Sequence, residues 1–488
     1  MAPPLGDMPA EEFRRFGHEA VDWIADYLAH PERYPVGPTT SPGELTDQLP
    51  AQGPEQGEPF EQILADFERL IVPKTVQWNH PGFLAWFAAG GSAPGVIAEA
   101  LTAALNQVGL LWKASPALVE VEQTTLAWLA NWLGLPTTWF GMIHDTASTA
   151  SLHALIAARQ AAADRARAAG RDFRLDRLTV YASEHAHMSI EKALLALGLG
   201  AEACRKIPAD AEYRLRPEAL ETAVAEDRRS GFEPAAVTAT IGTTSSAAVD
   251  PVPAIAEIAA RQNLWLHVDA AYAGAAALLP EKRRFFAGCE RADSFVMNPH
   301  KWLFAPMDVS AFYTARPEVF ERALSLTPEY LRHEADPRAV NLMEYSVPLG
   351  RRFRALKLWF ILRYFGRQGL ADRVREHCRL AQDLARRIDE HPDFETVAPV
   401  HFSLVCLRWR PQGVEDERLD QANERLVEAV NATGDFLLSG TRLSGKYVIR
   451  VAIGQIRTDE EHVDRLWRVV QKEAERLLGH LTKRPVEG

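Results

Sequence analysis

The sequence predicts an α/β protein with a mainly parallel sheet, a helical N-terminal segment and a small α+β unit at its C-terminal end. Apolar runs typical of strands alternate with helical patterns over residues 181–301, as in sheets whose strands are joined by crossover helices. Residues 11–29 and 59–72 place apolar side chains at helical spacing. From Gly369 onward the pattern is helix–strand–helix–strand–helix. We therefore expect three parts, which span residues 1–92, 93–367 and 368–488.

The composition fits a globular protein and argues against several classes of partner. Of the 488 residues, 47% are hydrophobic and 24% are charged, which excludes a disordered chain. The net charge of −11 argues against nucleic acid or an anionic membrane as the main partner. No run of about 18 apolar residues could span a bilayer, and the N-terminus lacks the basic and apolar parts of a secretory signal.

The four cysteines are widely scattered along the chain. They form neither a CxxC pair nor a cluster with histidine at zinc-binding spacing, so we expect no metal site. A cytoplasmic enzyme with reduced thiols is the simplest interpretation of these positions, which are Cys204, Cys289, Cys378 and Cys406.

The two predicted N-terminal helices are amphipathic, and each needs a surface that covers its apolar face. Residues 31–59 between them are rich in Pro and Gly, which indicates an extended connector. Two helices on so long a connector are not expected to form a simple hairpin or to cover their faces by packing on each other alone. Their partner would be the large domain of the same chain or a second subunit.

Residues 78–91 are mainly aromatic and small, which suits a pocket wall for a flat apolar group. Such a stretch is more often part of the core, so both interpretations stay open. Residues 105–112 are expected to add to the same pocket, from this subunit or a neighbouring one. Ser115 and Pro116 then begin a helix that runs to Leu133, with Pro in its first turn.

Small and hydroxyl-bearing residues at 141–151 lead into an alanine-rich helix that ends near Gly170. Backbone N–H groups at a helix N-terminus, together with the helix dipole, form a site for an anion such as phosphate. An ordinary helix cap would give the same pattern. Further strands are predicted at 178–182 and 234–241, and Asp250 is expected to cap a helix that follows the second of them.

Two more strands end in residues that can carry chemistry. Residues 264–268 are apolar and lead to Asp269, while residues 294–297 are followed by Pro299 and Lys301. The proline places the lysine in a loop beyond the strand rather than on a solvated helix face. Reactive groups gather beyond the carboxyl ends of strands in open α/β sheets.

An acid after a buried strand, with a lysine 32 positions later (301 − 269), suggests a site for pyridoxal 5'-phosphate, PLP. The lysine amine would form a Schiff base with the cofactor aldehyde, and the carboxylate would keep the pyridinium nitrogen protonated. A lone lysine is usually an ordinary surface residue. It is the context of Asp269 that favours the cofactor.

Residues 267–274 (His-Val-Asp-Ala-Ala-Tyr-Ala-Gly) and 298–302 (Asn-Pro-His-Lys-Trp) resemble the group II PLP-dependent decarboxylases, most closely the aromatic-L-amino-acid decarboxylases. The likeness extends over nearly the whole chain, from Phe13 to the last helix. It implies PLP fold type I with a sheet of the seven-stranded type. It also implies a homodimer in which the N-terminal segment wraps around the other subunit and the site lies at the interface.

The resemblance further implies roles for individual residues. Lys301 would carry the cofactor, His187 would stack on its ring, Asp269 would pair with the pyridinium nitrogen, and Tyr330 would protonate the substrate Cα. His185 would then be a bystander. The residues implied to bind the cofactor are Ala147, Ser148, His187, Thr244, Asp269, Asn298, His300, Lys301, Leu349 and Gly350. Those implied to line the substrate pocket are Trp86, Phe87, Ala88, Ala89, Val108, Leu110, His187 and Gly350.

Two segments between the large and small parts complete this expectation. Residues 326–337 have mixed polarity, two prolines and no periodicity, so they are expected to form an exposed loop. The family has a catalytic loop here, with a tyrosine at the position of Tyr330. The turn at Leu349 and Gly350 would reach the cofactor region of the partner subunit. A cluster of arginines after it, at 351, 352 and 354, could hold the turn through carboxylate or carbonyl contacts.

The implied reaction is decarboxylation of an aromatic L-amino acid to its amine. Animal members have Tyr-Phe-Pro-Thr where residues 86–89 are Trp-Phe-Ala-Ala, so the preferred amino acid is not fixed. One alternative is an aldehyde synthase on the same scaffold, which in the family goes with replacement of the loop tyrosine or the stacking histidine; both are present here. Acidic substrates are less expected, because residues 83–91 offer no cation. An inert binding protein is the alternative from a different class.

Overall fold

The computed structural model describes residues 6–38, 40–326 and 338–481. Its large domain contains a seven-stranded sheet with the order β1-β7-β6-β5-β4-β2-β3. Every pair from β6 to β3 is parallel and only β7 runs against its neighbours, which confirms the mainly parallel sheet. The strands are β1 (Phe140–His144), β2 (Leu178–Ser183), β3 (Cys204–Ile207), β4 (Glu233–Thr240), β5 (Trp265–Asp269), β6 (Ser294–Met297) and β7 (Ser310–Thr314).

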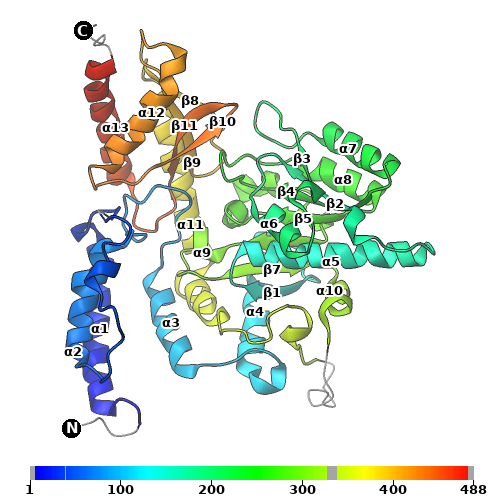
Figure 1. Cartoon of the computed structure of the whole chain (residues 1–488), viewed down its shortest axis with the longest axis horizontal. Helices are drawn as coiled ribbons and strands as arrows, with labels where there is room; N and C mark the ends of the chain where they lie inside the picture. Colours follow the sequence, from blue (N-terminus) through cyan, green and yellow to red (C-terminus); the bar gives the residue numbers. More distant parts are fainter. Residues whose placement is uncertain (1–5, 39, 327–337, 482–488) are drawn as a thin grey trace.

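Helices cover both faces of this sheet (Figure 1). The chain moves toward one edge through β1, β2 and β3 and then returns through β4 to β5. Right-handed crossovers therefore put α5 and α6 on one face and α7 and α8 on the other, and each pair packs together. The helices of this domain are α3 (Ala93–Leu105), α4 (Pro116–Leu133), α5 (Ala147–Ala168), α6 (Ser189–Ala196), α7 (Pro217–Arg229), α8 (Val252–Gln262), α9 (Pro299–Trp302) and α10 (Pro317–Leu324).

Two local predictions need correction. Lys301 lies in the short helix α9 instead of a loop, because Pro299 suits the first turn of a helix, yet its side chain faces the sheet edge rather than solvent. Asp250 does not cap α8. Its carboxylate accepts hydrogen bonds from the N–H groups of Leu215 (2.7 Å) and Thr240 (2.8 Å), and it thereby ties the end of β4 to the segment before α7.

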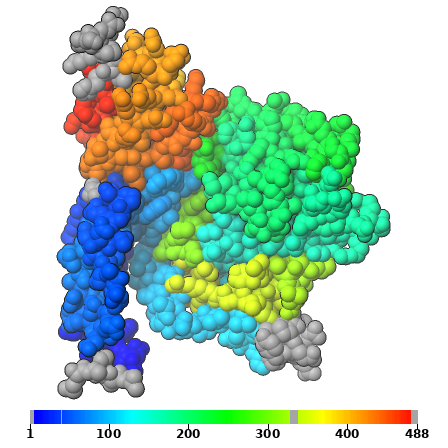
Figure 2. All heavy atoms as spheres, in the orientation of Figure 1, coloured from blue at the N-terminus to red at the C-terminus, as the bar shows by residue number. Residues whose placement is uncertain are grey.

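The N-terminal helices α1 (Ala10–Ala29) and α2 (Phe60–Asp66) lie side by side as an arm beside the rest of the chain (Figures 1 and 2). The rings of Phe16 and Phe60 are 4.7 Å apart, and those of Trp23 and Phe67 are 5.0 Å apart. The two helices touch because the long connector folds back through short helical turns, but, as expected, they do not cover their apolar faces on each other alone. Their pairing still leaves Phe13 68% exposed.

The small domain follows the long helix α11 (Ala355–Asp389) and contains an antiparallel sheet with the order β10-β11-β9-β8. Residue Leu84 is anchored to it, since its N–H donates to the carbonyl of Leu437 (3.0 Å) and its carbonyl accepts from the N–H of Ala452 (2.8 Å). The aromatic stretch 78–91 therefore rests on this domain. Its elements are β8 (Phe394–Thr396), β9 (Leu404–Trp409), α12 (Asp416–Asn431), β10 (Ser439–Leu443), β11 (Lys446–Ala452) and α13 (Glu460–Leu481).

Within the described ranges, no helix is both long and apolar enough to cross a membrane. The four cysteines are all buried and free. The limits proposed at residues 92 and 367 between the three parts of the chain remain a prediction.

Candidate active site

A cavity of about 190 Å³ lies at the carboxyl ends of the parallel strands. This is the edge where open α/β sheets place their ligands. It brings together three of the residues predicted to be catalytic, Lys301, Asp269 and His187. The full lining consists of Phe87, Thr146, Ala147, Ser148, His187, Thr240, Gly242, Thr244, Asp269, Ala271, Tyr272, Asn298, His300 and Lys301.

The sheet explains why an acid and a lysine 32 positions apart in the sequence meet here. Strands β5 and β6 are adjacent and parallel, with Asp269 opposite Val296, so both strand ends open into one crevice. The carboxylate of Asp269 is 5% exposed and accepts a hydrogen bond from the N–H of Ala271 (3.0 Å). Burial lowers the pKa of the Lys301 amine; nearby Asp269 opposes this shift and Arg450 reinforces it. A lysine with a lowered pKa is the nucleophile that a Schiff base needs.

His187 lies in the loop after β2 and faces the same cavity. Its Nδ1 accepts a hydrogen bond from the N–H of Ser189 (3.2 Å), so the neutral ring carries its proton on Nε2. Desolvation lowers the pKa of this imidazole, which keeps the ring neutral near pH 7. His185 instead packs edge-on against Tyr213 and is not part of the lining.

The start of α5, which follows the carboxyl end of β1, also lines the cavity. Ala147 and Ser148 are its first residues, and in the described structure the N-cap residue Thr146 makes no side-chain capping bond. The first N–H groups of the helix therefore face the cavity without a side-chain cap, as an anion site requires. Two buried oxygens at the cavity, Oδ1 of Asn298 and Oγ1 of Thr240, also have no hydrogen-bond partner in the described chain. These features fit a polar, phosphorylated ligand.

The remaining predicted polar residues also lie at this edge. Thr244 follows β4 and contributes to the lining. The ring of His300 is 3% exposed, and its Nδ1 accepts a hydrogen bond from the N–H of Val309 (3.0 Å). Burial lowers the pKa of His300 to about 4. This ring supports the segment that carries Lys301.

Of the four residues predicted as a substrate wall, only Phe87 lines the cavity. Its ring stacks on Tyr272 with centroids 3.8 Å apart, and Nζ of Lys301 lies 5.3 Å from the Phe87 centroid. Trp86 is 52% exposed and stacks on Trp78 instead. Ala88 is buried in a separate apolar cluster, and neither it nor Ala89 belongs to the lining.

Four further predicted residues are not brought to the cavity by this subunit. Val108 and Leu349 are 49% and 65% exposed, and a Cβ on Gly350 would lie 3.8 Å from a methyl group of Val108. Leu110 belongs to the same segment as Val108 and is likewise absent from the lining. The two segments thus meet each other, away from this subunit's own Lys301.

The arginines after this turn hold it as predicted. Arg351 donates to the carboxylate of Glu122 (2.6 Å) and to the carbonyl of Ile143 (2.7 Å). Arg354 pairs with Asp308 (2.9 Å), and Arg352 pairs with Glu99. The turn is therefore fixed to α3, α4 and β1.

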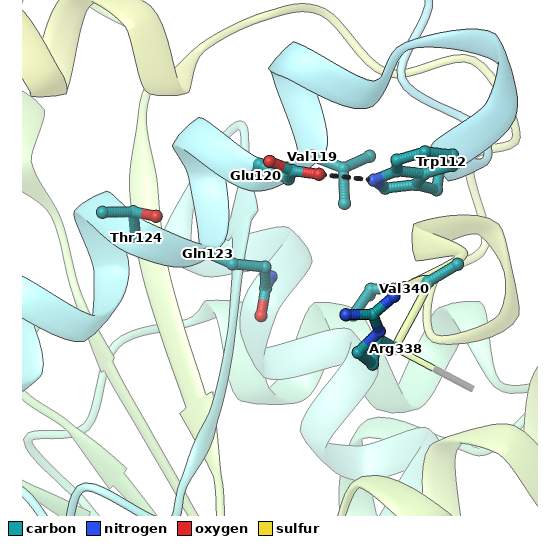
Figure 3. Close-up of a pocket in the computed structure, with 8 residues that line it drawn as sticks. Trp112, Val119, Glu120, Gln123, Thr124, Arg338 and Val340 are labelled. Atoms are coloured by element: carbon teal, nitrogen blue, oxygen red, sulfur yellow. Dashed lines mark hydrogen bonds between the residues drawn. The ribbon is translucent and has the colours of Figure 1, made fainter. Parts of the chain in front are cut away.

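Tyr330 lies outside the described residues, as does the loop segment 327–337. A second, larger cavity of about 570 Å³ is lined by residues 338–340 together with Trp112 and residues of α4 (Figure 3). Trp112 closes one side of it and donates from Nε1 to the carboxylate of Glu120 (2.9 Å), while Arg338 and Val340 lie opposite. Trp112 is the last residue of the stretch 105–112 that was expected to add to the substrate pocket, and it lines this cavity instead of the one at Lys301; no other residue predicted to bind cofactor or substrate is among its lining residues.

Sequence reasoning missed Arg450, which lies on β11 and is 3% exposed. Its guanidinium reaches the loop after β4 and lies 5.2 Å from the ring centroid of Phe87. The sequence did contain a signal for it, because an arginine interrupts the apolar run 448–452. A charged residue in a buried strand usually has a specific partner, so Arg450 could have been predicted to contact polar groups of another segment.

Comparisons with known proteins show which family and fold this chain resembles. A family model described as the pyridoxal-dependent decarboxylase conserved domain matches residues 42–410. The chain is 40% identical over 484 residues to phenylacetaldehyde synthase of Arabidopsis thaliana, covering 97% of this chain and 98% of that protein. It is 39% identical over 487 residues to tryptophan decarboxylase 2 of Oryza sativa subsp. japonica, covering 98% of this chain and 97% of that protein. The crystal structure of Oryza sativa TDC with PLP and tryptamine superposes with a TM-score of 0.93 at 37% identity, covering 98% of this chain and 100% of that chain.

Proposed function

Because this chain belongs to the pyridoxal-dependent decarboxylase family, we propose that it converts an aromatic L-amino acid into the corresponding amine and carbon dioxide. It is a PLP-dependent carboxy-lyase. The observation that carries the choice of substrate class is the cavity itself. Lys301, Asp269 and His187 share it with the ring of Phe87, so reactive groups and an apolar wall face the same space.

Several residues would hold the cofactor. Lys301 would bind its aldehyde carbon, Asp269 would pair with its ring nitrogen, and the N–H groups of Ala147 and Ser148 would receive its phosphate. Asn298 and Thr244 would add polar contacts. When bound, PLP supplies an electron sink for the bond that breaks.

The other residues act on the substrate. Nε2–H of His187 is free to donate to the substrate carboxylate, since Nδ1 is occupied by the N–H of Ser189. Phe87 offers its ring to an aromatic side chain and excludes water. Tyr330 would deliver the proton that replaces the lost carboxylate at Cα.

The close alternative is the aldehyde synthase, since relatives of both kinds have nearly the same identity to this chain. We favour the amine, because His187 and Tyr330, which would stack on the ring and return the proton, are both present. Purified enzyme should be incubated in air with PLP and, in turn, tryptophan, tyrosine, phenylalanine, dopa and 5-hydroxytryptophan. Carbon dioxide with an equal amount of amine supports the proposal. Aldehyde and ammonia with oxygen consumption would establish the synthase, and no carbon dioxide would reject both.

We also propose that the site is completed by a second subunit. Val108 and Leu349 are exposed, and neither lines the cavity that holds the same chain's Lys301, so both can contact another copy. The apolar residues left exposed on α1 and α2 would be covered in the same assembly.

Mixed subunits test this arrangement. Lys301→Ala and Leu349→Arg chains should each be inactive alone but active after unfolding and refolding together. The mixed dimer keeps one site with both segments intact, so random mixing should restore about a quarter of wild-type activity. A mixture that stays inactive, or a monomer in light scattering, would refute the shared site.

A further inference from the structure

Arg450 is a buried cation at the junction between the small domain and the cavity. It forms no ion pair in the described part of the chain. Its guanidinium donates to neutral oxygens, namely the carbonyls of Thr244 (2.7 Å), Ser245 (3.1 Å) and Trp86 (3.3 Å) and the hydroxyl of Ser439 (2.9 Å). A buried charge without a counter-ion is costly. Such an arrangement is expected where the rigid fork of an arginine has a function.

One of these contacts helps to hold Trp86 in an uncommon backbone conformation. Its φ is +45°, in the left-handed region that non-glycine residues rarely adopt. The Trp86 N–H donates to the hydroxyl of Ser439 (3.1 Å), and its carbonyl accepts from Arg450. Both peptide groups of this residue are therefore fixed. The chain direction they impose carries the next residue, Phe87, onto Tyr272.

The same guanidinium also fixes the opposite side of the cavity. Thr244 and Ser245 belong to the loop after β4, and Thr244 lines the cavity. The Arg450 Cζ lies 5.2 Å from the centroid of Phe87, whose ring is also 5.3 Å from the amine of Lys301. One side chain of the small domain thus joins the aromatic wall to the polar loop of the large domain.

We propose that Arg450 is a positioning residue, which holds the backbone of Trp86, and with it the wall residue Phe87, against the cofactor loop at Thr244 and Ser245. The inference rests on the proposed function, and it adds that Arg450 sets the distance between Phe87 and the loop at Thr244 and Ser245. Its charge has a second effect, since Arg450 and Lys301 both lie within 5.3 Å of the Phe87 ring centroid and the two charges repel each other. A misplacement of about 1 Å near a reacting centre costs about 100-fold in rate.

The test compares Arg450→Gln with Arg408→Gln. Arg408 is a matched control because it is also 3% exposed and lies on the neighbouring strand β9. Its guanidinium pairs with Asp420 (2.8 Å) and lines no part of the cavity. With the best aromatic substrate, Arg450→Gln should lower kcat/KM by about 100-fold. Arg408→Gln should lower the melting temperature to a similar extent and change kcat/KM by only a few-fold.

Two further variants separate position from charge. Arg450→Lys keeps the charge but lacks the fork, so it should lose much of kcat/KM. The pH midpoint of the visible absorbance of its PLP-loaded form should stay at the wild-type value. Arg450→Gln should move that midpoint upward, because the positive charge that lowers the pKa of Lys301 is lost. Ser439→Ala should lower kcat/KM in the same direction as Arg450→Gln, by a smaller factor.

Equal kcat/KM in Arg450→Gln and Arg408→Gln, or an unmoved pH midpoint in Arg450→Gln, would overturn the proposal. If Arg450→Gln does not fold, wild-type kinetics in Ser439→Ala would overturn it. A wild-type enzyme that releases no carbon dioxide from any aromatic amino acid would refute the proposed function. The absorbance midpoints and the PLP dissociation constants of the same variants would still decide the role of Arg450.

Discussion

At the scale of single residues, the environment of each ionisable group determines what it can do. Lys301 is partly buried in the cavity, near one acid and one cation that has no ion pair among the described residues, and its pKa is below that of an ordinary lysine. Burial and specific charged neighbours are what mark a reactive lysine.

Lys301→Ala should abolish turnover and the visible absorbance of the PLP-loaded protein while leaving the fold intact, because no other amine in the described lining can replace it. Absorbance, carbon dioxide release and thermal unfolding are the measurements. The exposed Lys446 serves as a control, since Lys446→Ala should behave as wild type. Near wild-type activity in Lys301→Ala would exclude this residue as the cofactor lysine.

Phe87→Glu should lower kcat/KM for aromatic substrates more than 100-fold, which corresponds to a rise of about 3 kcal/mol in the activation free energy. The reason is that the carboxylate replaces an apolar wall and neutralises Lys301. Trp86→Glu is the comparison. That side chain is 52% exposed and outside the lining, so its effect should be much smaller. Similar losses in both variants, or a wild-type preference for glutamate, would contradict the apolar-wall assignment.

Tyr330→Phe keeps the ring and removes the proposed proton donor. Carbon dioxide release should continue at a reduced rate, and in air the product should change from amine to aldehyde plus ammonia, because the unprotonated carbanion can react with oxygen. Product analysis under air and under argon gives the answer. An undiminished amine yield in air, with no oxygen uptake, would assign protonation to another group.

At the scale of elements, the turn at residues 347–351 contacts its own subunit on one side and is exposed on the other. Arg351 fixes it to Glu122 on α4, whereas Leu349 is exposed. Under the dimer proposal, the open side faces the substrate of the partner subunit. Such a turn can change selectivity without changing the fold of its own subunit.

Gly350→Ser should shift preference from indole toward phenol or imidazole side chains, because it adds a hydroxyl and removes space. The new Cβ meets only a Val108 methyl group, at 3.8 Å, so the turn tolerates it. Gly350→Ala separates the two causes, since it fills space without adding a hydrogen bond. Unchanged relative kcat/KM for tryptophan and tyrosine would remove Gly350 from the pocket.

At the scale of the whole molecule, buried histidines make stability depend on pH. Burial lowers the pKa of both His267 and His377 to about 4, against about 6.5 in the unfolded chain. The unfolded state therefore binds more protons between these values, so stability is lost as pH falls from about 6.5 toward 4. Asp250, whose pKa burial raises to about 6, acts in the opposite direction.

Urea unfolding should show a lower stability at pH 5 than at pH 7.5, by up to on the order of 2 kcal/mol for each such histidine. The change should persist without PLP, because these two rings lie outside the cavity lining. His377→Gln should reduce the difference in unfolding free energy between pH 5 and pH 7.5 by roughly the contribution of one histidine. Equal stability at both pH values would show that the buried rings are protonated in the folded state.

Much of the fold could be predicted because its elements are set by local patterns. The helix predicted from Pro116 to Leu133 has those bounds in the structure, and the strand ends at Asp269 and Met297 lie where turn-forming and polar residues follow apolar runs. The lysine and the acid were found from these ends alone. Periodic burial and chain-breaking residues act over a few positions, so the sequence displays them directly.

Other features depended on which elements lie side by side. Arg450 meets Trp86 and Thr244, which are more than 200 positions away in the sequence, only because the small sheet packs against both the N-terminal segment and the loop after β4. The pairing of α1 with α2 and the separation of Leu349 from Lys301 were decided in the same way.

The sequence by itself determined most element types and the class of chemistry, and it is the source of the proposal that Lys301 and Asp269 bind the cofactor. The tertiary structure decided which side chains share the cavity and that Arg450 packs against the aromatic ring of Phe87. The reason is that local patterns record whether a residue is buried, whereas the packing of distant elements determines what it is buried against.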